Sequence, residues 1–220
     1  MSWRFKRNVA LFVLSAVAGG LFYWAVSDPV VIRRETPIDL GEPISEIPPF
    51  ELENAHGGTL GRDDLLGKYW IADLIYTNCS AECPMMTRRM SRLQESLPGG
   101  EADDVRLVSI SVDPRNDTAT ILRDYAAKER ANPQRWHFLR GDEETVRRLA
   151  TEGFKVGWSP DDPLQHSQRL VLVDPRGRVR GLYHAAEDDE IDRLHRDLAW
   201  LREHEPAGAA EPDPAAASDQ

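Results

Sequence analysis

The hydrophobic residues of this chain form one long uncharged run, followed by shorter runs separated by polar turns. Val9 to Val26 contains eighteen residues without a charge. As a helix it would extend about 27 Å, close to the hydrocarbon thickness of a bilayer. Three basic residues and no acidic residue precede the run, which favours an N-terminus on the inside of the membrane. We therefore predict a membrane anchor over residues 1–27.

A cleaved signal peptide is the alternative interpretation of this N-terminus. Ala25-Val26-Ser27 offers small residues at a cleavage-like spacing. The apolar run is longer than the usual hydrophobic region of a signal peptide, so we favour the retained anchor. Both interpretations export residues 28 onward. The predicted location is a bacterial inner membrane, crossed once, with the C-terminal domain in the periplasm.

The shorter runs after residue 27 alternate between strand-like and helix-like patterns. Strands are predicted over 50–53, 59–60, 69–76, 105–112, 136–139, 169–173 and 179–183, and helices over 84–97, 118–129, 143–151 and 187–203. Strand–helix–strand units imply a parallel centre, and the hairpin over 169–183 adds antiparallel strands. The predicted fold class is α/β, a mixed sheet flanked by helices on both faces.

Prolines and capping residues set the predicted boundaries. Five prolines within 28–49 predict a semi-extended tether, and the composition of 205–220 predicts a disordered tail. A single domain over 50–204 remains between them. Asp117 and Asp142 precede helical patterns, and aspartate is a favoured N-cap residue. We predict that these two residues cap the helices that follow them.

Composition narrows the function classes. The chain has 220 residues, a formal net charge of −10 and two cysteines. A disulfide scaffold is excluded because two cysteines are too few. A nucleic-acid partner is not expected, because no basic excess exists to neutralise phosphates.

Both cysteines lie between the strand over 69–76 and the helix that follows it. Pro84 suits a first helical turn, so Cys83 is expected at the helix N-terminus and Cys79 in the preceding loop. Unpaired N–H groups at a helix N-terminus favour a thiolate. Two thiols at this spacing can form a disulfide or bind one soft metal ion. Inert core cysteines are the alternative, and the pair alone does not choose between redox and metal chemistry.

A histidine is the natural third ligand for such a metal. His166 ends a loop just before the strand over 169–173, which makes it the candidate. His137 lies inside a short apolar strand and is expected in the core. His195 and His204 lie in or just after the last predicted helix and are expected on the surface.

Three sequence stretches resemble the Sco (SenC) family. Thr77-Asn78-Cys79 through Cys83-Pro84 is similar to its T-x-C-x-x-x-C-P motif, and residues 111–118 (SVDPRNDT) are similar to its S-x-D-P-x-x-D-T motif. His166-Ser167 and the hairpin after it resemble the ligand histidine and hairpin of the family. The resemblance covers residues 45–203. It departs between the cysteines, where Ser80-Ala81-Glu82 replaces the frequent Pro-Asp-Val.

The resemblance implies a thioredoxin-like fold and a copper site. Cys79, Cys83 and His166 match the positions that bind copper, as Cu(I) or Cu(II), in the family. It further implies that the protein delivers copper to the CuA site of cytochrome c oxidase during assembly, or reduces the cysteines of that site. The expected partner is the CuA-bearing subunit or another copper or thiol protein. A periplasmic thiol–disulfide oxidoreductase without a metal role is the alternative, and a purely structural assembly factor is a third.

Two neighbouring features invite further hypotheses. Asp73 interrupts the buried strand six residues before Cys79, and an acid below a redox pair can relay protons in thioredoxin-like folds. A structurally satisfied carboxylate is the alternative. Met85, Met86 and Met90 follow the cysteines on the helix. We expect Met86 and Met90 to pack into the core, although thioethers are also soft copper ligands.

Overall fold

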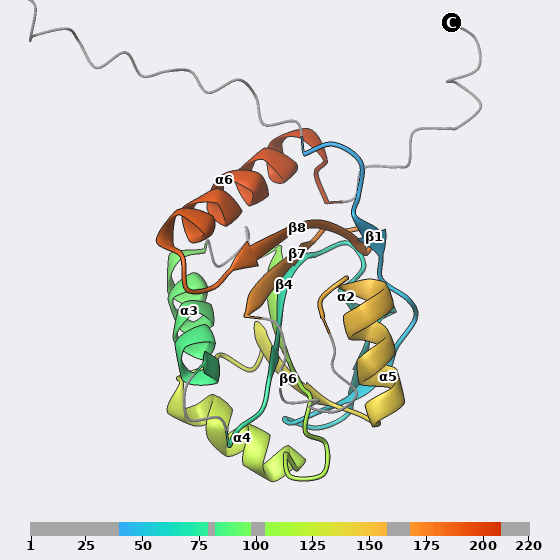
Figure 1. Cartoon of the computed structure of the whole chain (residues 1–220), viewed down its shortest axis with the longest axis vertical. Coiled ribbons are helices and arrows are strands. Elements are labelled where there is room, and N and C mark those ends of the chain that lie inside the picture. Colours follow the sequence, from blue (N-terminus) through green and yellow to red (C-terminus); the bar gives the residue numbers. More distant parts are fainter. Residues whose placement is uncertain (1–39, 79–81, 98–103, 158–167, 208–220) are drawn as a thin grey trace, which may run out of the picture. The chain divides into compact units, whose positions relative to one another are not determined.

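The computed structural model describes residues 40–78, 82–97, 104–157 and 168–207 (Figure 1). All of them belong to one compact unit, Asp39–Gln220. Its strands are β1 (Ser45–Glu46), β2 (Glu51–Asn54), β3 (Thr59–Gly61), β4 (Tyr69–Ile75), β5 (Val105–Ser111), β6 (Trp136–Arg140), β7 (Arg169–Val173) and β8 (Arg178–His184). Its helices are α2 (Arg62–Leu65), α3 (Glu82–Ser96), α4 (Ala119–Lys128), α5 (Glu143–Arg148), η2 (Leu149–Gly153) and α6 (Asp188–His204).

The strands form one mixed sheet in the order β1-β8-β7-β4-β5-β6-β2-β3. The three central strands β4, β5 and β6 are parallel, and β7 runs antiparallel to β4. The hairpin of β7 and β8 extends the sheet on one side, and β2 and β3 extend it on the other. This arrangement confirms the predicted mixed sheet with a parallel centre.

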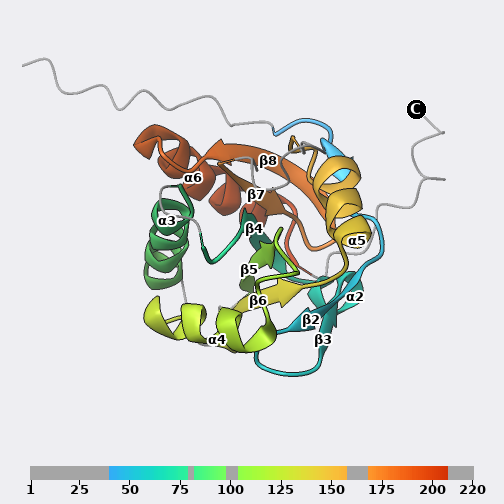
Figure 2. The same ribbon diagram turned by 60° about the horizontal axis from the view of Figure 1, so that its bottom comes forward.

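Helices cover both faces of the sheet (Figures 1 and 2). One face packs against α3, α4 and α6, through side chains such as Met90, Leu122 and Leu198. The other packs against α2 and α5, with Trp70 near the aromatic rings of Phe50 and Phe154. All seven residues of β4 are buried, as a strand covered on both faces must be.

The folded unit begins and ends outside the predicted domain boundaries. β1 lies within the predicted tether, where it pairs with β8, and Ile47 just after it is fully buried. Glu205 lies within the predicted tail, yet its carboxylate pairs with Arg178 and Arg180. These long-range contacts, which local composition does not reveal, correct the predictions at 28–49 and 205–220. Residues 208–220 lie outside the described part of the chain.

One of the two predicted helix caps is wrong. Asp142 caps α5, because its side chain accepts a hydrogen bond from the Thr145 amide at 2.9 Å. For α4 the cap is Thr118, whose hydroxyl accepts from the Ile121 amide. Asp117 stands one residue earlier, and its carboxylate binds elsewhere. Either residue suits an N-cap, and tertiary contacts decide between them.

No helix in the described ranges is both long and apolar enough to cross a bilayer. The predicted anchor over residues 1–27 lies outside these ranges, so it stays a prediction.

Candidate thiol and metal site

The candidate site is attached to one edge of the sheet. β4 ends at Ile75, beside Ser111 at the end of parallel β5. β7 is antiparallel to β4, with Ala72 opposite Val171, so β7 begins at the edge where β4 ends. Asn78 follows β4 and Gln168 precedes β7, so the described residues nearest to Cys79 and His166 lie at the same edge of the sheet.

The predicted ligands themselves lie largely outside the described residues. Cys79 and His166 fall in the ranges 79–81 and 158–167, which are not described. Cys83 belongs to the first turn of α3, as predicted, but its side chain is not among those described. Within the described residues, no group of three or more His, Cys, Asp or Glu side chains could hold a metal ion.

Asp73 is buried on β4, with only 1% of its surface exposed. The Ser109 hydroxyl donates to its Oδ1 at 2.6 Å, and the Trp136 indole donates to that hydroxyl at 2.9 Å. Among the described residues, Asp73 Oδ2 has no hydrogen-bond partner. Burial outweighs the Ser109 hydrogen bond and raises the pKa of Asp73 to about 7. The predicted burial is confirmed, and the carboxyl can change protonation near neutral pH.

A second buried carboxylate, Asp117, lies at the same edge. It accepts hydrogen bonds from the Thr77 amide at 3.1 Å, the Thr77 hydroxyl at 2.5 Å and the Ser111 hydroxyl at 2.6 Å. Sequence reasoning missed this cluster because it assigned Asp117 to a helix cap. A signal was available in the sequence, because Thr77 belongs to the T-x-C-x-x-x-C-P stretch and Ser111 and Asp117 belong to the S-x-D-P-x-x-D-T stretch.

Met86, Met90 and His137 pack within the fold rather than at this edge. Met86 and Met90 are fully buried, which confirms their predicted packing role. His137 is half-buried on β6, with Nδ1 3.3 Å from Asn54 Nδ2. Burial, and then nearby Arg106 and His56, lower the pKa of His137 to about 4. A neutral imidazole is therefore expected at this position at neutral pH.

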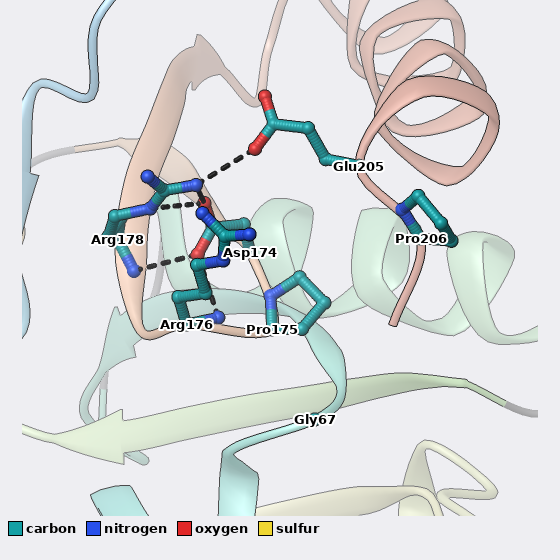
Figure 3. Close-up of a pocket in the computed structure, with 7 residues that line it drawn as sticks. All are labelled: Gly67, Asp174, Pro175, Arg176, Arg178, Glu205 and Pro206. Carbon is teal, nitrogen blue, oxygen red and sulfur yellow. Dashed lines mark hydrogen bonds and ion pairs between the residues drawn. The ribbon is translucent and has the colours of Figure 1, made fainter. Parts of the chain in front are cut away.

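A pocket of about 220 Å³ lies at the opposite edge of the sheet, where β7 turns into β8 (Figure 3). Arg178 reaches Asp174 at 2.7 Å and Glu205 at 2.8 Å across it. Opposite charges therefore compensate one another here, and the network joins the β7–β8 turn to the end of α6.

Comparison with known proteins assigns the family. The model of the SCO1/SenC family matches residues 39–202. The chain belongs to the SCO1/SenC family. It is 35% identical to the SCO1 protein homolog of Bacillus subtilis, over 70% of this chain and 81% of that protein. It is 30% identical to a putative copper-binding protein of Stutzerimonas stutzeri, over 72% of this chain and 78% of the relative.

Solved structures agree with the fold. BsSco, described as a member of the Sco family of cytochrome c oxidase assembly proteins with a disulfide switch, has a TM-score of 0.62 at 33% identity, covering 72% of this chain and 95% of its own. Sco proteins solved with copper bound, from Arabidopsis thaliana, Bradyrhizobium japonicum and yeast, are 23%, 24% and 22% identical and support the fold alone. A SCO1/SenC family relative from Bacillus anthracis is a lipoprotein. These findings confirm the thioredoxin-like Sco fold.

Proposed function

We propose that this SCO1/SenC protein binds copper through Cys79, Cys83 and His166 and serves in cytochrome c oxidase assembly. Family membership carries the proposal, together with a relative that is described as a copper-binding protein. The fold is compatible with it, because Asn78 and Gln168, the described residues nearest to Cys79 and His166, follow β4 and precede β7 at one edge of the sheet. Two thiolates suit Cu(I), and an added imidazole lets the same site hold Cu(II).

The proposed partner is the CuA-bearing subunit of the oxidase or another copper or thiol protein. An N-terminal anchor over residues 9–26 would hold the folded unit at the outer face of a bacterial inner membrane. The eighteen uncharged residues and the basic residues before them support this placement. Mass spectrometry of the mature N-terminus distinguishes the retained anchor from a cleaved signal peptide.

Anaerobic copper titration of the exported domain tests the ligand set. We expect one copper ion per wild-type protein, held by two Cys–S ligands. His166→Ala is expected to weaken Cu(II) binding by at least about tenfold, because it removes the nitrogen ligand. His204→Ala is the matched control, since His204 is exposed and stacks on Trp200 at the far end of α6. Loss of copper to a modest chelator by the wild-type protein would argue against a copper role.

Reduction of a partner disulfide is the second candidate function, and Asp73 favours it. In this reaction two electrons and two protons pass from Cys79 and Cys83 to the partner, and an intramolecular disulfide forms. Asp73 lies on the sheet face covered by α3. Ile71, two residues earlier on β4, points to the same face and packs in the same hydrophobic cluster as Met86 of α3. Position 83 precedes Met86 by three residues, a spacing that places two positions on one helix face. With a buried carboxyl whose pKa is raised to about 7, Asp73 is our candidate for the group that accepts and returns a thiol proton.

Asp73→Asn tests this proton relay. We expect the rate of disulfide exchange at pH 8 to fall by at least about tenfold, because general-base catalysis is lost. The inflection near pH 7 in the wild-type rate profile should disappear, whereas copper affinity should stay close to wild type. Asp197→Asn is the control, because Asp197 is also buried but accepts its hydrogen bond from Tyr183. Equal exchange rates of Asp73→Asn and wild type at every pH would contradict a proton-relay role of Asp73.

A further inference from the structure

Asp117 connects three separate segments at the edge of the sheet that carries the candidate site. Thr77 follows the end of β4, Ser111 ends β5, and Asp117 itself precedes α4. Its carboxylate is 1% exposed and lies between the other two residues. One buried side chain therefore fixes the exit of the central strand against the next strand and the next helix.

The directions of the hydrogen bonds are fixed by the groups around them. The Ser111 hydroxyl oxygen accepts from the Asp113 amide at 3.1 Å, so its hydrogen is free to point to Asp117 Oδ2. The Thr77 hydroxyl and amide both donate to the carboxylate. Asp117 acts only as an acceptor in all these contacts, which is the arrangement that suits an ionised carboxylate.

The backbone that carries Asp117 is held independently of Thr77. The Arg140 guanidinium donates to the carbonyl of Asp117 at 2.8 Å and to that of Pro114 at 2.9 Å, and it pairs with Glu53 at 2.6 Å. Thr118 supplies the cap of α4, so the helix does not need the Asp117 side chain. The carboxylate is thus free to hold the segment that leaves β4.

Only Asn78 separates Thr77 from Cys79. A hydrogen-bonded amide and hydroxyl at Thr77 limit the directions in which the chain can continue toward the first cysteine. Residues around a metal site that orient its ligands change metal affinity by about 10- to 100-fold when they are replaced.

We propose that Asp117 is a positioning residue for the cysteine pair, acting through Thr77. Its role is to hold Thr77, two residues before Cys79, against the end of β5 and the start of α4. For copper this inference rests on the proposed function, whereas for the thiols alone it does not.

Four variants of the full-length protein test the proposal. Asp117→Asn removes the charge and brings an amide donor toward two hydroxyl donors. Thr77→Val removes the side-chain hydroxyl while keeping nearly the same side-chain shape, whereas Thr77→Ser keeps the hydroxyl. Asp197→Asn is the control for loss of a buried carboxylate elsewhere. The measurements are Cu(I) affinity by chelator competition, the Cu(II) spectrum, the midpoint potential of the Cys79/Cys83 couple and the thermal midpoint.

We expect Cu(I) affinity to fall about 10- to 100-fold in Asp117→Asn and about tenfold in Thr77→Val. Thr77→Ser and Asp197→Asn should bind copper as the wild type does. The Cu(II) spectrum should change in the first two variants only. Because Thr77→Val and Thr77→Ser keep the carboxylate, their comparison remains decisive even if Asp117→Asn does not fold.

Two results would overturn the proposal. One is unchanged affinity, spectrum and potential in Asp117→Asn and Thr77→Val; the other is an equal loss in Thr77→Val and Thr77→Ser. If the wild-type protein binds no copper, the proposed function fails. The positioning role is then tested by the midpoint potential of the Cys79/Cys83 couple alone. The potential of Thr77→Val should then differ from wild type by about 30 mV, the equivalent of tenfold, while Thr77→Ser should not differ. An unchanged potential in that case would overturn the positioning role as well.

Discussion

Asp174→Ala is expected to lower the free energy of unfolding by about 3 to 5 kcal/mol, because it removes one partner of a buried ion pair. Asp174 is 1% exposed and accepts from the backbone amides of Arg176 and Arg178 in the β7–β8 turn. It also pairs with the side chains of Arg178 at 2.7 Å and Arg180 at 3.4 Å. Arg180 is itself buried, and after loss of Asp174 it keeps the Glu205 carboxylate, at 2.6 Å, as a partner.

Urea unfolding of Asp174→Ala and the wild type measures this loss. Glu144→Ala is the matched control, because Glu144 also pairs with an arginine, Arg147, but at an exposed position. Exposed pairs contribute little, so the control should leave the denaturant midpoint nearly unchanged. A midpoint for Asp174→Ala that equals that of the control would show that Glu205 alone neutralises Arg180.

The protein is expected to lose stability between pH 5 and pH 8 through Asp73, and Asp73→Asn should abolish this loss. Burial raises the pKa of Asp73 from 3.8 to about 7. In the window between these values the folded state binds the proton and the unfolded state does not. The contribution of Asp73 to the free energy of unfolding is therefore fully present below the pKa of Asp73 in the unfolded chain, and it is lost as the pH rises toward 7.

The expected loss from Asp73 is on the order of 2 to 3 kcal/mol between pH 5 and pH 8, from the linkage relation. Unfolding free energies of wild type and Asp73→Asn should be measured at both values. The difference between the two proteins isolates Asp73 from all other titrating groups. A wild-type curve that runs parallel to the Asp73→Asn curve would mean that Asp73 is ionised in the folded protein throughout this range.

Local sequence patterns predicted the elements that are long and continuously buried. β4 and β5 are apolar runs, and Pro84 correctly indicated the first turn of α3. β1 was missed because Ser45 and Glu46 are two residues among prolines and become a strand only by pairing with Val179 and Arg178.

At the candidate site, the sequence drew attention to Asp73 and Asp117 but did not indicate their hydrogen-bond partners. Asp73 was identified as a buried acid, but Ser109 and Trp136, which complete its hydrogen-bond chain, belong to two other strands. Asp117 was identified as a capping residue because the following segment is helical. Its real partner, Thr77, lies 40 residues earlier in the chain, and only the fold brings the two together. The ligand set of Cys79, Cys83 and His166 stays a prediction.

The hydroxyl of Tyr69 has a consequence for how the chain folds. It donates to the carbonyl of Glu205, 136 residues later, and so ties the first residue of the central strand to the end of the last helix. β7, which pairs with β4, is also about 100 residues distant in sequence. Contacts of such separation slow folding, because loop-closure entropy is lost before they form. The central strand therefore keeps an unpaired edge until the last third of the chain is available, and binding partners that cover this edge during folding would protect the protein from aggregation.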